Sequence, residues 1–161
     1  MYEQLLAFAI AFANLLGPVD RGPADEVRAT LDGIVQAVEA DPRPPITGTR
    51  EGDVALLADW SFHEARWRLW DPKRPGRCIS GDGGKSLGPL QVQGLAEEIA
   101  CAPATEAAVW LARAHDAIAT CGDLTPIASG HCGGARRLVR FRVGQAARIL
   151  GKARTVKRVK R

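Results

Sequence analysis

The segment that decides the fold begins with ADWSFHEARW at positions 58–67 and continues, after an irregular stretch, with SGDGGKSLGPLQVQ at positions 80–93. The first part has helical spacing, because Leu57, Trp60 and Glu64 lie three or four residues apart and share one helix face. The second part is rich in glycine, which favours turns and lets a ligand approach the backbone closely. We therefore predict a helix that ends near Glu64, followed by a Gly-rich loop or small hairpin.

Helical patterns flank this segment on both sides. The predicted helices have apolar residues at helical spacing and turn or capping residues at their ends, and they cover residues 2–16, 23–40, 50–66, 94–100, 103–120 and 135–152. The 161 residues are 46% hydrophobic and 25% charged, which suits one domain with a substantial core. We predict a mainly α fold with an N-terminal helical extension (1–46) that packs on a main domain (47–152), and a basic C-terminal tail (153–161).

Charge is distributed unevenly along the chain. From Arg136 to Arg161 there are 11 basic and no acidic side chains, which leaves 11 basic against 18 acidic residues elsewhere. A basic C-terminus on an acidic body predicts a polyanionic partner. Nucleic acid, anionic cell-wall polymer and lipid headgroups all match this charge. Nucleic acid is the less favoured partner, because the segment has no helix-turn-helix spacing and no basic strand interleaved with aromatic residues.

The most apolar run, Leu5–Leu16, predicts neither a membrane span nor an ordinary signal peptide. It is shorter than the roughly 20 apolar residues that a bilayer requires. Glu3 precedes the run and the first basic residue, Arg21, follows it, whereas a signal peptide begins with positive charge. We therefore expect no transmembrane segment and no clear signal peptide.

Four cysteines, Cys78, Cys101, Cys121 and Cys132, allow either reduced buried thiols or two disulfides. None forms a Cys-x-x-Cys pair, so we do not expect a structural zinc site. Cys101 and Cys121 flank one predicted helix, whose length keeps them too far apart to bond. If bridges form, Cys121 with Cys132 across the intervening loop is the favoured pair.

Glu64 is the strongest candidate for chemistry. Leu57, Trp60 and Trp67 are predicted on its face, so its carboxyl group is expected to be poorly solvated and to keep its proton near neutral pH. A protonated carboxyl group is what a general acid needs to donate to a leaving oxygen. From its position on the helix alone, Glu64 is better explained as a glutamate whose side chain reaches solvent than as a general acid. The Gly-rich loop that follows favours the general acid instead.

Three pieces, His63-Glu64-Ala65, Gly81–Gly84 and Leu87–Val92, together resemble goose-type lysozymes and the related lytic transglycosylases of the lysozyme superfamily. Those families carry a catalytic Glu near a helix end, then a Gly-rich loop and a Gly-x-x-Gly-Leu-Met-Gln segment. Thr125–His131 falls where they often place a turn beside the acid. The resemblance spans roughly residues 53–150 and leaves out the first two predicted helices.

The sequence departs from the family pattern at five positions. Ala65 replaces the usual Ser, Pro89-Leu90 replaces Leu-Met, and Ile127 stands where the turn usually has Tyr. Gln93 stands where goose-type enzymes often carry a second acid, which leaves Asp82 as the candidate to position a water molecule.

The resemblance implies a lysozyme-like catalytic domain that cleaves the β-1,4 bond between N-acetylmuramic acid and N-acetylglucosamine in peptidoglycan. Glu64 would be the general acid and Asp82 a possible helper, and the implied substrate contacts are Ser86, Gln91, Ser129 and Trp67. Neither a metal nor another cofactor is expected, because the reaction requires a proton on the leaving oxygen and a polar wall. Water-dependent hydrolysis and the anhydro-forming transglycosylase reaction both remain open.

The same resemblance predicts that the protein acts at the bacterial cell wall, as a secreted, periplasmic or virion-associated enzyme, where its basic C-terminus would hold anionic wall polymer. The alternative hypothesis is a protein without enzymatic activity that binds nucleic acid or cell wall through its basic C-terminal helix.

Overall fold

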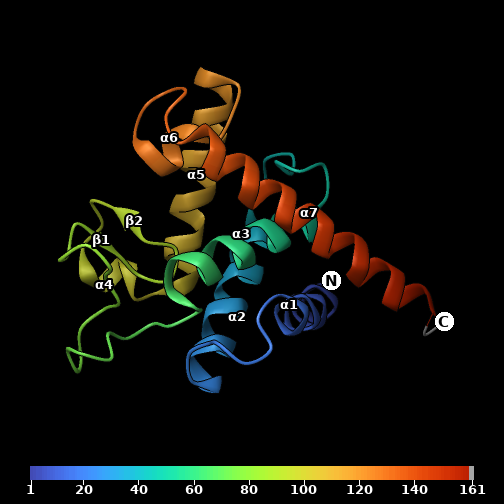
Figure 1. The fold of residues 1–161 in the computed structure, drawn as a ribbon, viewed down its shortest axis with the longest axis horizontal. Coiled ribbons are helices and arrows are strands. Elements are labelled where there is room, and N and C mark those ends of the chain that lie inside the picture. The colour runs from blue at the N-terminus through green and yellow to red at the C-terminus, as the bar shows by residue number, and fades with distance from the viewer. Residues whose placement is uncertain (160–161) are drawn as a thin grey trace.

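The computed structural model describes the backbone of residues 1–159 and the side chains of residues 1–154 (Figure 1). Its elements, in chain order, are α1 (Tyr2–Leu16), α2 (Ala24–Ala40), α3 (Arg50–Ala65), β1 (Ser86–Leu87), β2 (Val92–Gln93), α4 (Glu97–Ala100), α5 (Pro103–Cys121), α6 (Thr125–Ser129) and α7 (Arg136–Val159). The predicted mainly α fold is confirmed. None of the described helices is both long and apolar enough to cross a bilayer.

Helix α3 lies at the centre of the molecule and is buried on nearly all sides, as is typical of a helix surrounded by protein (Figure 1). The helices α1, α2 and α7 pack against it. At its start, the Thr49 side chain accepts a hydrogen bond from the backbone N–H of Gly52, and the Asp53 carboxylate accepts from the N–H groups of Ile46 and Thr47. These bonds fix the start of α3 and therefore the place of Glu64 near its other end.

The two N-terminal helices form part of the core. Phe12 of α1 and Ile34 of α2 belong to the same hydrophobic cluster as Leu57 of α3, Trp110 of α5 and Ile149 of α7. The N-terminal helices thus pack on the rest of the chain, and the cluster runs through them without interruption.

Helix α7 is longer than predicted. It continues through Val159, so residues 153–159 extend the helix and do not begin a separate tail at 153; residues 160–161 lie outside the described part. The reason is that the apolar spacing of Val139, Ala146 and Ile149 continues to Ala153, and all four are buried.

Two disulfides fasten the irregular parts of the chain, Cys78–Cys101 and Cys121–Cys132. The favoured Cys121–Cys132 pairing is confirmed, and the alternative of four reduced thiols is wrong. The Cys78–Cys101 bond joins the loop after α3 to the end of α4. The Gly-rich segment forms a small antiparallel hairpin, in which Ser86 pairs with Gln93 and Leu87 with Val92.

Candidate active site

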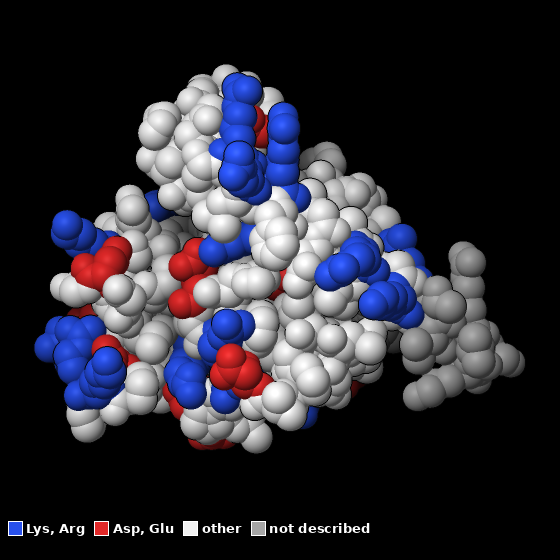
Figure 2. Space-filling view, in the orientation of Figure 1, with Lys and Arg blue, Asp and Glu red and all other residues white. Residues whose placement is uncertain are grey.

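A cavity of about 680 Å³ opens beside α3, which is within the range of roughly 300–1,000 Å³ typical of small-molecule sites. Its walls come from the end of α3, residues 81–93, α5, the segment around α6 and the start of α7. Figure 2 shows the surface hollowed between the upper lobe, which contains α6, and the lobe that carries β1 and β2, with acidic and basic side chains near the hollow.

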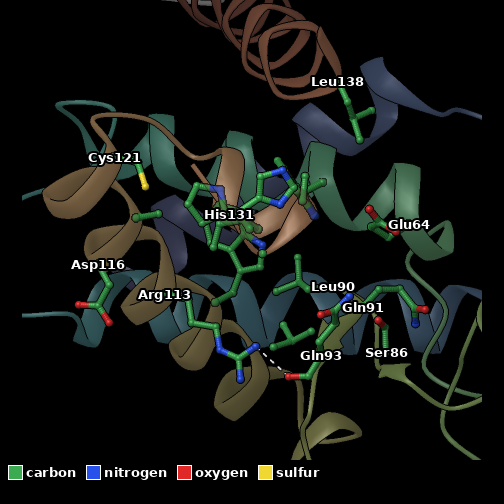
Figure 3. Close-up of a pocket in the computed structure, with 18 of the residues that line it drawn as sticks. Glu64, Ser86, Leu90, Gln91, Gln93, Arg113, Asp116, Cys121, His131 and Leu138 are labelled. Carbon is green, nitrogen blue, oxygen red and sulfur yellow. Dashed lines mark hydrogen bonds between the residues drawn. The ribbon is translucent and has the colours of Figure 1, made fainter. Parts of the chain in front are cut away.

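Four of the predicted site residues, Glu64, Asp82, Ser86 and Gln91, line this cavity. Figure 3 shows Glu64 toward one end, on the same side of the view as Ser86 and Gln91, whereas Asp116 lies at the other end. The fold thus brings the end of α3 and the Gly-rich segment to one cavity, as the sequence predicted.

Glu64 is oriented from two sides. Helix α3 ends just after it, because Arg66 adopts the left-handed conformation (φ 54°) and its N–H closes on the carbonyl of Phe62. The Glu64 side chain is 29% exposed, and its Oε1 accepts a hydrogen bond from Nη1 of Arg142 at 2.6 Å. A carboxyl group held in this way is both fixed in direction and accessible from the cavity.

Arg142 belongs to the site and not to the basic surface where the sequence placed it. The residue is 7% exposed, and its guanidinium lies 4.5 Å from the centre of the Trp60 ring, a cation–π contact. The sequence predicted Leu57, Trp60 and Trp67 beside Glu64 and gave no sign of this charged neighbour. The inward position follows from helical spacing, since Arg142 lies three residues after the buried Val139 and so turns toward α3.

A second carboxyl group lies beneath this pair. Asp59 is fully buried on α3, and His63, one turn later, approaches it with Nε2 at 3.4 Å from Oδ1. Burial raises the pKa of Asp59 to about 7, although the positive charge of Arg142 acts in the opposite direction. Burial also lowers the pKa of His63, and the charges of Arg142 and Arg66 lower it further.

Asp82 organises the Gly-rich loop from within. Its Oδ1 accepts hydrogen bonds from the Ser86 N–H at 2.8 Å and from the Ser80 hydroxyl at 3.1 Å. Burial raises the pKa of Asp82, but the hydrogen bonds from Ser86 and Ser80 outweigh that effect and hold the pKa below its usual value. Asp82 is therefore a carboxylate near neutral pH, and its oxygens are partly engaged in shaping the loop.

Gln91 fastens the same loop with its whole amide group. Its Oε1 accepts from the Gly81 N–H, and its Nε2 donates to the carbonyl oxygens of Ile79 and Gly88. With both amide hydrogens and the oxygen engaged, Gln91 serves chiefly to shape the cavity wall, and its predicted contact with a ligand would be secondary.

A buried glutamate on α5 supports the hairpin from behind. Glu106 is fully buried, and its Oε1 accepts a hydrogen bond from the Leu90 N–H at 2.9 Å. Burial raises the pKa of Glu106 to about 8, against the opposing effect of the hydrogen bonds from Leu90 and Val92. Gly88 passes directly over this carboxyl group with φ 86°, and a side chain there would collide with Glu106 and with the Ala100 carbonyl oxygen.

The far end of the cavity has its own polar groups. Arg113 of α5 lines the cavity and donates to the Gln93 carbonyl oxygen at 2.8 Å (Figure 3). Asp116 and His131 line the same end, beside the Cys121–Cys132 disulfide. The cavity therefore offers polar contacts well beyond the neighbourhood of Glu64.

Trp67 does not take part in the site, contrary to prediction. Arg66 and Trp67 both have positive φ, and this turn carries the Trp67 ring back under α3, where it is fully buried. Its Nε1 donates to the Ala58 carbonyl oxygen at 2.8 Å, and its own carbonyl accepts from the Thr30 hydroxyl. Trp67 is a core residue and cannot stack on a sugar.

Ser129 is not among the cavity-lining residues, although its neighbours Ala128 and Gly130 are. Its hydroxyl donates to the carbonyl oxygens of Thr125 and His131. The hydroxyl thus closes the turn that follows α6, and the predicted substrate contact through Ser129 is not supported by the geometry.

Three residues of the site escaped the sequence reasoning, Asp59, Glu106 and Arg142. Each is a charged residue within a run of apolar positions at helical spacing, and that is the signal that would have marked it as buried. The pairing of Arg142 with Glu64 joins residues 78 positions apart, which no local pattern shows.

Comparisons with protein-family models, with curated proteins and with solved structures found no match to this chain. Among the described residues, no group of three or more His, Cys, Asp or Glu side chains is arranged to hold a metal ion. The site is therefore characterised by its own geometry, which is a cavity with one partly exposed glutamate, a guanidinium against it and a glycine-rich wall.

Proposed function

We propose that the protein cleaves the β-1,4 bond between N-acetylmuramic acid and N-acetylglucosamine in peptidoglycan, with Glu64 as the general acid. The observation that carries the proposal is the convergence of Glu64, Asp82, Ser86 and Gln91 on one cavity of about 680 Å³. A partly exposed carboxyl group at the end of a buried helix, opposite a glycine-rich wall, suits a reaction that needs a positioned proton.

The chemistry begins with the Glu64 carboxyl proton. Glu64 donates it to the glycosidic oxygen, the C1–O bond breaks, and the bonding electron pair remains on the departing oxygen. The sugar then carries an oxocarbenium-like positive charge at C1. A nucleophilic oxygen then bonds to C1 and gives up its own proton to a carboxylate, which is Glu64 when the 6-hydroxyl of the sugar attacks and Asp82 when a water molecule attacks from the opposite face. Arg142, bonded to Oε1 of Glu64, would hold the carboxylate in place when the proton has left.

Two nucleophiles are compatible with this scheme, and they give different products. If Asp82 positions a water molecule, the product has a free reducing end, and the depressed pKa of Asp82 keeps it in the anionic form that this role requires. If the 6-hydroxyl of the muramyl residue attacks instead, Glu64 suffices and the product is a 1,6-anhydro sugar. Because the Asp82 carboxylate already accepts hydrogen bonds from Ser86 and Ser80, a water molecule would have to share it with the loop.

The substrate contacts that support the proposal come mainly from the loop and hairpin. Gly81 and residues 90–93 line the cavity and would face hydroxyl and N-acetyl substituents, and Ser86 adds a partly engaged hydroxyl. We infer that the protein acts at the bacterial cell wall, whether secreted, periplasmic or virion-associated. Its two disulfides support a protein that works in an oxidising compartment.

The experiment is digestion of purified peptidoglycan by the wild-type protein, with mass analysis of the released fragments. Fragments with reducing N-acetylmuramic acid ends would identify hydrolysis, and 1,6-anhydro ends would identify the transglycosylase reaction. Glu64→Gln serves as the inactive control, and Glu98→Gln, which removes an exposed carboxylate from α4, serves as the matched active control. Absence of glycan cleavage by the wild type would overturn the proposal.

A second candidate function, polyanion binding, rests on the outer face of α7. Its exposed basic side chains are Arg136, Arg137, Arg140, Arg148, Lys152 and Arg154. We propose that this face holds anionic wall polymer, with nucleic acid as the alternative ligand. The test compares binding of wall teichoic polymer and of duplex DNA as salt increases, in the wild type and in Arg140→Gln/Arg148→Gln.

For either ligand, removing two contacts should lower the slope of log affinity against log salt by about two units. Tighter binding of the wall polymer supports the proposal, and tighter binding of DNA favours the alternative. Binding that is insensitive to both substitutions would overturn this use of α7.

A further inference from the structure

The buried carboxyl group of Asp59 has an unusual environment. Neither of its oxygens has a hydrogen-bond partner, although the side chain is fully buried. Buried carboxyl groups normally bond to several donors, because an unpaired one costs free energy. By contrast, the buried Glu106 accepts a hydrogen bond from Leu90. Asp59 therefore has the His63 ring close by, with Nε2 at 3.4 Å from Oδ1, but holds no hydrogen bond in this arrangement of side chains.

Besides His63, Arg142 is the other candidate partner of Asp59. Its Nη1 bonds to Glu64, but its Nε is buried without an acceptor. The charge of Arg142 acts on both Asp59 and His63, so the guanidinium lies within electrostatic reach of this second carboxyl group. The guanidinium is thus bonded to Glu64 and acts on Asp59 through its charge.

Among the charged groups around Asp59, Arg142 has the main electrostatic influence on the Asp59 carboxyl group. His63 lies one turn along α3 and is 23% exposed, which connects Asp59 to solvent. Arg66 acts on His63 from beyond it. The buried faces of α1 and α2, which also pack against α3, carry no titratable side chain.

We propose that Glu64 and Asp59 share one proton across the guanidinium of Arg142, so that binding of substrate moves the proton to Glu64 and the pairing of Arg142 to Asp59. This inference rests on the proposed function of Glu64. In the free protein the proton lies on Asp59 and Arg142 pairs with the Glu64 carboxylate. In the complex the proton lies on Glu64 and Arg142 pairs with the Asp59 carboxylate.

The exchange conserves both protons and charge. Each arrangement has one proton, one carboxylate and one guanidinium, so the net charge of the three groups does not change. Asp59 gives up its proton through His63 and solvent, and Glu64 takes one up as the glycan displaces water from the cavity. An arginine beside a general acid lowers the pKa of the acid and so disfavours its protonated form. In the proposed exchange, the Asp59 carboxylate offsets the charge of Arg142 when Glu64 is protonated, so this effect on Glu64 is reduced. Asp59 and Arg142 are then positioning residues for Glu64.

The first test requires no substrate and no activity. The carboxyl carbons of the aspartates are labelled with ¹³C, and the titration of Asp59 is followed by nuclear magnetic resonance in the wild type, Glu64→Gln and Glu98→Gln. In Glu64→Gln the charge of Arg142 is left to Asp59 alone, so we expect the Asp59 titration to move down by about one pH unit or more. Glu98→Gln should leave it unchanged.

A second pair of variants separates sharing through Arg142 from a direct effect of Glu64. Arg142→Met should move the Asp59 titration upward, and in that background Glu64→Gln should have a much smaller effect than it has in the wild type. An Asp59 titration that is the same in the wild type and in Glu64→Gln would overturn the proposal. So would an equal response to Glu64→Gln with and without Arg142.

The second test uses cleavage and distinguishes this proposal from the proposed function. Asp59→Asn keeps the size of the buried side chain but cannot take the negative charge. The cleavage rate of Asp59→Asn should therefore fall more at pH 7 than at pH 5. At pH 7 the expected loss is about tenfold for each pH unit by which the pH–rate profile of the variant moves to lower pH. A purely structural role would lower the rate equally at all pH values. If the wild type cleaves no glycan, the proposed function fails, while the titration of Asp59 still decides whether the proton is shared.

Discussion

The two walls of the cavity use polar side chains in opposite ways. On the loop wall, Gln91 and Asp82 bond to backbone groups of their own segment, so their polarity maintains the shape of the wall. On the helical wall, Glu64 is partly exposed, Arg142 bonds to it through one nitrogen, and Asp59 has no hydrogen-bond partner. The polar side chains Gln91 and Asp82 of the loop wall thus bond within their own segment, whereas the helical wall contains buried polar atoms without a hydrogen-bond partner.

This difference assigns separate tasks to the walls. A segment whose polar side chains bond to its own backbone holds a fixed surface against which a ligand can lie. A wall with an accessible carboxyl group and unpaired buried atoms can change its protonation and pairing. The chemistry should therefore depend on α3 and α7, whereas the loop and hairpin should govern stability and fit.

The largest effect on stability is expected where the loop wall rests on α5. Gly88→Ala places a side chain at φ 86° against Glu106 and the backbone of Ala100. We expect it to lower the free energy of unfolding by about 2–4 kcal/mol, measured by urea denaturation. Gly84→Ala is the matched control, since Gly84 also has positive φ (101°) but no heavy atom near its missing side chain. Equal effects of the two changes would show that the loop does not rest on Glu106.

The next effect concerns pH and the same buried glutamate. Because the pKa of Glu106 is about 8 in the folded protein against 4.5 as its reference value, the folded state binds more protons between these values. Stability should therefore decrease as pH rises from about 5 to 8, and Glu106 should contribute about 1.4 kcal/mol per pH unit to that slope. Asp59, with a pKa of about 7, contributes in the same direction up to that pH.

Glu106→Gln should remove the contribution of Glu106, so that the free energy of unfolding depends less steeply on pH. The measurement is urea denaturation of the wild type and the variant at several pH values, with Glu98→Gln as the control that keeps the wild-type slope. An unchanged slope in Glu106→Gln would mean that Glu106 does not retain its proton in the folded protein.

A smaller effect is expected within the loop. Gln91→Ala removes three hydrogen bonds to the backbone of residues 79–88. We expect a loss of about 1–2 kcal/mol in the free energy of unfolding, together with faster amide hydrogen exchange confined to the loop. Gln93→Ala, which alters an exposed side chain in the same hairpin, should change stability by less than about 0.5 kcal/mol. If the two variants behave alike, Gln91 does not organise the wall.

The helices could be predicted from sequence because their signals are local. The apolar spacing of α1, α2, α3 and α5, with turn residues at their ends, placed most boundaries within a residue or two. The course of Trp67 could not be predicted in this way. It depends on two consecutive residues with positive φ, and neither is a glycine that would have announced the turn.

In the site, too, the features with a local sequence signal could be predicted, and those that depend on packing between distant segments could not. Glu64 and the Gly-rich segment carried their own signals, whereas the pairing of Glu64 with Arg142 depends on how α7 packs across α3. The basic C-terminal charge was visible in the sequence, but the inward turn of Arg142 was hidden among arginines that face outward. A count of charge shows how many basic residues there are, and only packing shows which of them is buried.

The measurement that tests the central claim most directly is the rate of release of soluble fragments from purified peptidoglycan by the wild type, Glu64→Gln and Glu98→Gln at one pH and protein concentration. If Glu64 is the general acid, Glu64→Gln should reduce the rate by about 100-fold or more, while Glu98→Gln keeps the wild-type rate. Release by Glu64→Gln at the wild-type rate would contradict the assignment of Glu64.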